Sequence, residues 1–194
     1  MKPESNNISF DYRLDSSDCI TFVNSEWLSF AEQNKAPEIS QSIIGKSVWC
    51  YLAGKEVRHL YELIFDAVRN RNKEIVIPFR CDSPTSRRYM ELKVSPRVDK
   101  NLSLAAHILQ EEARPYVALL DSGEQSDKRD TENYLKICSW CKRLNLKTER
   151  WVEVEQAIRE LELFEEASLP GLTHGICPDC VASIRCEIEQ ASEA

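Results

Sequence analysis

Residues 89–94 read Tyr-Met-Glu-Leu-Lys-Val, and apolar and polar side chains alternate along this stretch. Because successive side chains of a strand point to opposite faces, the alternation predicts a strand whose Met, Leu and Val residues share one face. Residues 102–109 repeat the pattern, and residues 74–80 form a further strand candidate just before both. The sequence therefore predicts three successive strands in the middle of the chain.

Two more strands and the helices lie on the N-terminal side of these three strands. Residues 8–13 and 19–23 predict a hairpin, because a turn-rich run of Asp and Ser residues joins them. Asn24 or Ser25 can cap the helix that follows, and apolar spacings of three and four in residues 56–72 predict a long helix. This order of elements predicts an α+β fold, in which one antiparallel sheet carries helices on a single face.

The order of these motifs resembles that of a PAS sensory domain. Residues 20–24, Ile-Thr-Phe-Val-Asn, and the next helix with Trp27 and Phe30 are similar to the second strand and first helix of that family. Residues 45–49, Gly-Lys-Ser-Val-Trp, are similar to its glycine-plus-hydrophobic turn. The resemblance covers residues 1–112 and implies five antiparallel strands that cup helices around a small core or ligand cavity.

Two pairs of cysteines, Cys138 with Cys141 and Cys177 with Cys180, lie in the last third of the chain with 35 residues between the pairs. Two residues between paired cysteines let both sulfurs reach one ion, so the spacing predicts a zinc site with four thiolate ligands. His174 could replace one cysteine as a ligand, but because four thiolates already complete a tetrahedron we expect it to donate a hydrogen bond to a sulfur instead. Four thiolates leave no open position for a catalytic water, and an iron-sulfur cluster that uses the same thiolates is the alternative.

The cysteine segment also resembles small cysteine-rich modules found beside bacterial sensory domains. The resemblance covers residues 134–186 and rests on residues 137–142, Trp151 and the Thr-His-Gly-Ile-Cys-Pro-Asp-Cys run of residues 173–180. It implies a treble-clef-like zinc fold, with one ligand pair on a knuckle and the other at the first turn of a helix. Pro178 fits a first helical position, where a missing backbone donor costs nothing.

Composition divides the chain into a PAS-like domain at residues 1–120, an acidic linker at 121–133 and a cysteine-rich zinc module at 134–194. The linker contains no large apolar side chain, which is typical of an exposed segment. The module carries seven basic and eleven acidic residues, and this balance disfavours nucleic-acid binding because contacts with phosphates need a basic surface. The candidates for such a surface are Lys142, Arg143, Lys147 and Arg150.

Two further groups of residues have a structural interpretation. The arginines at positions 80, 87 and 88 flank a proline turn and could hold an anionic ligand, but we favour pairing with local acids such as Asp82 and Glu91. The cysteines outside the two pairs are expected to be small packed residues. These are Cys19, Cys50, Cys81 and Cys186.

The function that these features predict is non-enzymatic. The five glycines form no phosphate-binding loop, and no nucleophile and base stand out. No apolar run approaches the roughly 20 residues that a bilayer crossing needs, so we expect a cytoplasmic protein with no membrane contact, whose thiols stay reduced.

We expect a bacterial signalling protein that senses a signal, such as a small ligand in its cavity, or interacts with other proteins through the PAS-like domain. The zinc module would contact a protein partner, and the chain could also form a homodimer. One alternative is a redox or metal sensor that uses the four cysteines, and another is a transcription regulator that binds DNA. The sequence does not identify the signal or the partner.

Overall fold

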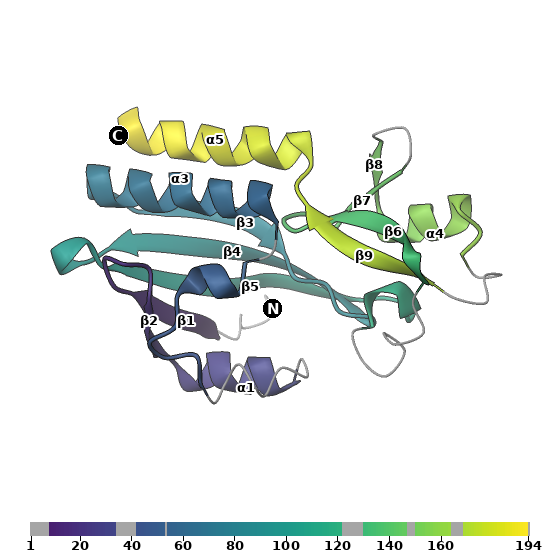
Figure 1. The fold of residues 1–194 in the computed structure, drawn as a ribbon, viewed down its shortest axis with the longest axis horizontal. Coiled ribbons are helices and arrows are strands. Elements are labelled where there is room, and N and C mark those ends of the chain that lie inside the picture. The colour runs from purple at the N-terminus through teal and green to yellow at the C-terminus, as the bar shows by residue number, and fades with distance from the viewer. Residues whose placement is uncertain are drawn as a thin grey trace, which may run out of the picture.

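The computed structural model of the chain contains two sheets (Figure 1). It describes residues 8–33, 42–52, 54–121, 130–146, 150–163 and 169–193. The larger sheet has the strand order β2-β1-β5-β4-β3, and each neighbouring pair is antiparallel. Its strands are β1 (Ser9–Leu14), β2 (Ile20–Val23), β3 (Ile75–Arg80), β4 (Ser86–Pro96) and β5 (Leu102–Ala113). The expected α+β class with a five-stranded antiparallel sheet is confirmed.

The β4–β5 hairpin forms the middle of this sheet. Met90, Leu92 and Val94 are all buried, so the alternation that predicted β4 does mark its core face. Both strands are longer than expected, because their ladder begins at the pair Ser86 and Ala113, where the residues are mostly polar and show no alternation.

The first helix, α1 (Ser25–Gln33), follows the first hairpin. Asn24 Oδ1 accepts a hydrogen bond from the backbone N–H of Trp27 at 2.9 Å. Of the two predicted candidates, Asn24 is therefore the residue that caps the helix. The Phe30 ring of α1 packs on Phe10 of β1, with 4.7 Å between the ring centroids. This contact holds α1 against the N-terminal end of β1.

The helix α3 (Lys55–Arg71) matches the long helix that the spacing predicted. Its buried side chains, Val57, Leu60, Ile64, Phe65, Ala67 and Val68, form the apolar face that the sequence indicated. Asn72 ends the helix in a left-handed conformation with φ of 53°, which Asn tolerates better than most residues. Three short 3-10 helices, η1 (Val48–Cys50), η2 (Val98–Lys100) and η3 (Ala118–Leu120), connect other elements.

The smaller sheet has the order β8-β7-β6-β9 and contains one parallel pair, β6 with β9. Its strands are β6 (Asp130–Cys138), β7 (Leu144–Asn145), β8 (Trp151–Val152) and β9 (Pro170–Gly175). Two helices belong to the same part of the chain, α4 (Val154–Glu160) and α5 (Pro178–Glu193). The segment expected to be a linker overlaps β6, which begins at Asp130, and residues 122–129 lie outside the described residues.

The helix α5 leaves the smaller sheet and lies alongside α3 (Figure 1). Ile184 of α5 is almost fully buried in the core of the larger sheet, and the guanidinium of Arg71 donates a hydrogen bond to the Ile188 carbonyl. The larger core therefore includes residues from the last third of the chain. In the opposite direction, Val117 and Leu119, which follow β5, are buried in the core of the smaller sheet.

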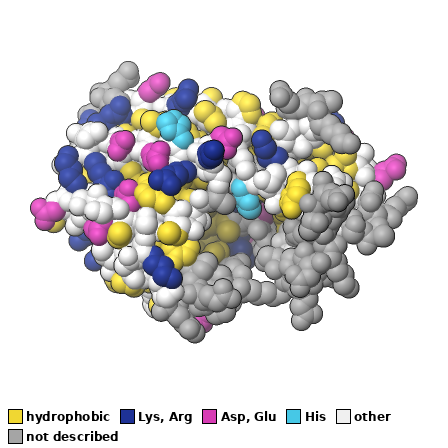
Figure 2. Space-filling view, in the orientation of Figure 1, with side chains coloured by type: hydrophobic (Ala, Val, Ile, Leu, Met, Phe, Trp, Pro, Cys, Tyr) yellow, Lys and Arg dark blue, Asp and Glu magenta, His cyan; other side chains and the backbone are white. Residues whose placement is uncertain are grey.

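The surface carries charges of both signs. On the face in Figure 2, Lys and Arg side chains are interspersed with Asp and Glu, and a hollow opens near the centre of the view. Within the ranges described above, no helix has the length and apolar character that a bilayer crossing requires.

Candidate metal centre and ligand pocket

The four paired cysteines meet where the two sheets adjoin. Strand β6 ends at Cys138, and its parallel pairing with β9 places Gly175 opposite Cys138, so the second pair of cysteines follows directly. All four Sγ atoms lie within 4.8 Å of one another, and Cys141 Sγ lies 3.7 Å from Cys177 Sγ. A tetrahedral zinc ion with Zn–S bonds of about 2.3 Å holds its sulfurs about 3.8 Å apart. The cysteines are therefore spaced as ligands of one metal ion.

Backbone amides surround the sulfurs. Cys138 Sγ accepts N–H groups from Cys141 at 3.5 Å and from Cys177 at 3.4 Å, and Cys177 Sγ accepts the N–H of Cys180 at 3.4 Å. Lys142 adopts a left-handed conformation with φ of 62°, and its N–H donates to the Cys138 carbonyl, which closes the turn after the first pair. Because amide donors stabilise a charged sulfur, both turns suit thiolates.

The thiols of Cys138, Cys141 and Cys180 differ in pKa because they form hydrogen bonds with one another. Hydrogen bonds from the thiols of Cys141 and Cys180 hold the pKa of Cys138 well below its usual value, although burial acts in the opposite direction. The hydrogen bond to Cys138 raises the pKa of Cys141 to about 11 and also raises the pKa of Cys180. A divalent cation would supply the charge that lets the other thiols ionise, since thiolates rather than thiols bind metals.

His174 lies on β9 with an exposed side chain. Although the residue is exposed, the protein atoms around part of its ring and, to a smaller extent, the charge of Lys142 lower the pKa of the imidazole. The cluster of metal-ligating atoms consists of the four sulfurs, without a nitrogen of His174. The expected hydrogen bond from His174 to a sulfur stays a prediction.

The expectation for the other cysteines is wrong at two positions. Cys50 and Cys186 are exposed, whereas Cys19 and Cys81 are partly buried. Cys186 lies two residues after the buried Ile184, and two residues on a helix turn the side chain to the opposite face. Cys50 lies two residues after the buried Val48 in η1, and so on another side of that 3-10 helix.

The arginine stretch forms an ion-pair network between the two halves of the chain. Arg80 pairs with Asp82 at 2.5 Å, as expected, and also with Glu153 at 2.8 Å, which lies just before α4. Arg87 contacts both carboxylate oxygens of Glu155 at 3.0 Å. Arg114, which the sequence did not single out, pairs with the fully buried Asp82 side chain at 3.2 Å.

The expectation that Glu91 pairs with these arginines is wrong. The neighbours of Glu91 on the adjacent strands are Pro78 and His107, so no arginine lies opposite it. Burial alone would lower the pKa of Arg80, but the hydrogen bonds that its guanidinium donates to Asp82 and Glu153 raise the pKa overall. Arg80 and Arg87 therefore join the larger sheet to the start of α4, whereas Arg88 pairs with Glu111 within the larger sheet.

The basic residues that could have formed a nucleic-acid surface are largely paired. Arg143 forms an ion pair with Asp179 at 3.0 Å, and Arg150 forms one with Glu160. Lys142 Nζ donates to the Ser139 carbonyl at 2.8 Å. Lys147 lies outside the described residues.

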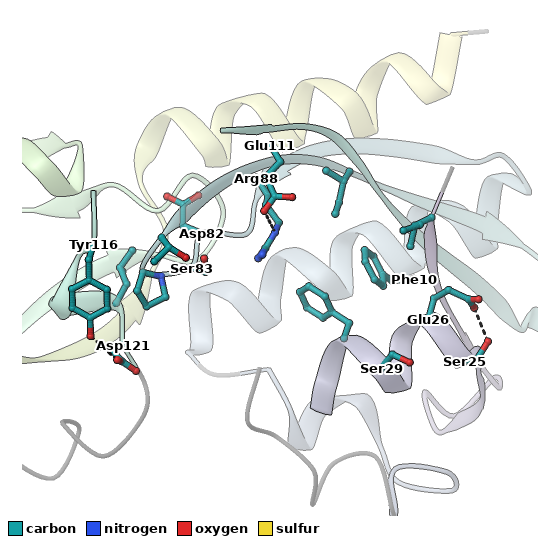
Figure 3. A pocket seen from close by; sticks show the side chains of 16 residues that line it. Phe10, Ser25, Glu26, Ser29, Asp82, Ser83, Arg88, Glu111, Tyr116 and Asp121 are labelled. Carbon is teal, nitrogen blue, oxygen red and sulfur yellow. Dashed lines mark hydrogen bonds and ion pairs between the residues drawn. The ribbon is translucent and has the colours of Figure 1, made fainter. Parts of the chain in front are cut away.

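A pocket of about 790 Å³ opens between α1 and the strands β4 and β5. Figure 3 shows Phe10 together with Ser25, Glu26 and Ser29 on one side, and Arg88 paired with Glu111 on the other. Arg88 Nε donates to Glu111 at 2.9 Å, and one further nitrogen of its guanidinium, Nη1, is buried without a partner. The pocket thus combines aromatic and hydroxyl groups with one partly satisfied arginine.

Comparisons with known proteins add little to this geometry. No protein-family model matches the chain, and no curated protein matches it. Among solved structures, the chain is similar to a domain of an HTR-like protein from Haloarcula marismortui ATCC 43049. The two are 17% identical, the match covers 53% of this chain and 98% of that chain, and the TM-score is 0.33. Such a similarity carries no argument about function.

Proposed function

We propose that the chain is a non-enzymatic signalling protein, in which a PAS-like unit receives a signal and a zinc-stabilised cysteine unit contacts a protein partner. The observation that carries the proposal is the position of the cysteine cluster. Cys138 and Cys177 are fully buried in the same core as the larger sheet, together with Trp140. A change in that sheet would therefore reach the metal centre and its surface through direct packing.

A structural role for the metal is favoured over a catalytic or redox role. Four thiolates around one ion leave no position for substrate or water. An iron-sulfur cluster distributes its thiolates over two or four iron atoms, and that requires wider spacing than the 4.8 Å within which these sulfurs lie. Zinc is accordingly the metal that we propose.

The pocket beside α1 is the proposed entry point of the signal. Its volume of about 790 Å³ falls within the range of small-molecule sites, about 300–1,000 Å³. A ligand that binds one conformation of α1 better than another would shift the equilibrium between them.

The metal content of the purified protein tests the proposal first. Elemental analysis, without added metal or chelator, should give one zinc per chain for the native protein and none for Cys141→Ser. Cys186→Ser is the matched control, because Cys186 is exposed and lies outside the cluster, and it should keep the zinc. Iron with visible absorbance would instead favour the redox sensor, and an absence of metal in the native protein would contradict the proposal.

The partner is tested by affinity capture on the immobilised protein. Zinc-loaded native protein should retain a specific protein from a lysate of its host cells, and Cys141→Ser should lose it while Cys186→Ser keeps it. Capture that is equal for all three variants would show that the cysteine unit is not the contact surface.

A further inference from the structure

A second cavity, of about 260 Å³, lies where the larger sheet meets the first cysteine pair. Its walls come from the segment after η1, the start of α3, the end of β3, the turn between Cys138 and Cys141, and β9. None of the residues that line it lines the pocket beside α1. It is therefore a separate site, and its residues come from both halves of the chain.

The charged groups around this cavity are all basic. Arg80 and Lys142 are the charged side chains that line it, and no Asp or Glu is among the lining residues. Asp82 and Glu153 neutralise Arg80. Lys142 donates only to a backbone carbonyl, and it forms no ion pair with any acid in the part of the chain that the structure describes.

Two hydrogen-bond donors in the walls have no acceptor. Trp140 Nε1 is buried without a partner, and the Tyr61 hydroxyl makes no hydrogen bond with any described residue. Burial raises the pKa of Tyr61 to about 12, so its hydroxyl keeps its proton at neutral pH and can donate. The two rings pack together with 5.2 Å between their centroids. Buried donors are almost always satisfied in proteins, so Trp140 Nε1 calls for an acceptor from outside the chain, and the Tyr61 hydroxyl can donate to the same acceptor.

Leu52, Val57 and Phe79 form an apolar part of the cavity wall beside the two rings. We propose that this cavity binds a small carboxylate whose acid group pairs with Lys142 and accepts hydrogen bonds from Trp140 and Tyr61. The apolar part of the ligand packs on Leu52, Val57 and Phe79. Drug-sized sites usually measure about 300–1,000 Å³, so a cavity of about 260 Å³ suits a single ring or a short chain. The inference goes beyond the proposed function, because it depends neither on the identity of the metal nor on the pocket beside α1.

Isothermal titration calorimetry on the full chain with benzoate, phenylacetate and hexanoate tests the site, with benzamide as the uncharged analogue. At least one acid should bind saturably with one site per chain, and benzamide should bind at least tenfold more weakly. Lys142→Gln should weaken the acid at least tenfold, whereas Lys93→Gln should leave it unchanged, because Lys93 pairs with Glu74 on the larger sheet.

A second measurement keeps the proposal testable if Lys142→Gln fails to fold. In the native protein labelled with ¹⁵N-tryptophan, the bound acid should shift the indole N–H signal of Trp140 downfield, since that group gains an acceptor. Tyr61→Phe, which keeps the ring, should weaken binding several-fold. Failure of all three acids to bind saturably at millimolar concentration would overturn the proposal, as would an equal shift caused by sodium chloride at the same ionic strength.

Discussion

The two hydrophobic cores of the molecule differ in what they contain. The core of the larger sheet combines aliphatic residues with Phe65 and Trp140 and includes the buried cysteines Cys138 and Cys177. Among the described residues, the buried side chains in the core of the smaller sheet are all aliphatic. This core contains about half as many buried residues as the larger one. The candidate metal centre thus belongs to the larger core, although its residues come from the segment that builds the smaller sheet.

This difference shows that the halves of the chain interlock. The larger core takes Ile184 from α5, and the smaller core takes Val117 and Leu119 from the segment after β5. Damage at the metal centre should therefore destabilise the larger sheet as well, whereas two independent units would unfold separately.

Removal of the proposed zinc is the strongest test of whether the two cores unfold together. Structural zinc contributes roughly 10–16 kcal/mol in small modules, so chelation or Cys138→Ser should have the largest effect on the free energy of unfolding. Urea unfolding of the native protein, with and without a chelator, measures the effect by far-UV circular dichroism and tryptophan fluorescence. In the presence of the chelator, both signals should show the same decrease in the urea concentration at the midpoint of unfolding.

The exposed Cys186 again provides the matched control, because Cys186→Ser should unfold at the native midpoint. A chelator that lowers one transition while a second stays at its original midpoint would show that the two cores are independent. That result would favour the division into separate domains that the composition predicts.

Local patterns in the sequence explain why the five strands and the four cysteines could be predicted. Alternation in residues 89–94 and the two-residue spacing within each cysteine pair are properties of neighbouring residues. The position of α5 could not be predicted, since its apolar stripe could pack on any apolar surface. The partners of Arg80 and Arg87 lie about seventy residues away, and a single sequence does not show which distant acids meet them.

The ion-pair network between the halves should give the next largest effect. Asp82→Ala leaves Arg80 and Arg114 buried without their shared carboxylate, and loss of one partner in a buried pair costs about 3–5 kcal/mol. Urea unfolding measures the loss. Glu111→Ala is the matched control, because Glu111 is exposed and its one ion pair among the described residues is with Arg88, so it should cost under about 1 kcal/mol. Equal small losses in both variants would mean that the network contributes little to joining the halves.

The packing of α5 on the larger sheet can be tested at Ile184. Ile184→Ala removes a nearly fully buried side chain, which should cost about 3 kcal/mol, within the range known for such truncations. The measurement is the shift in thermal midpoint, with Glu189→Ala on the exposed side of the same helix as the control. If both variants kept the native midpoint, α5 would not be part of the larger core in solution.

The smallest predicted effect concerns Tyr61, whose ring packs on Trp140 across the junction of the two halves. Burial raises its pKa from 10.0 to about 12, so the folded protein keeps a proton that the unfolded chain releases. This contribution to stability is complete below pH 10 and is lost as the pH rises toward 12. From the size of the shift, it amounts to about 2.7 kcal/mol, of which about 2 kcal/mol is lost by pH 12. Tyr61→Phe should accordingly lose about 2 kcal/mol less than the native protein between pH 9 and pH 12 in urea unfolding. Tyr134→Phe should follow the native curve, since Tyr134 is exposed. Identical alkaline profiles for the native protein and Tyr61→Phe would mean that the Tyr61 hydroxyl is in contact with water, and the junction would then be more open than its packing indicates.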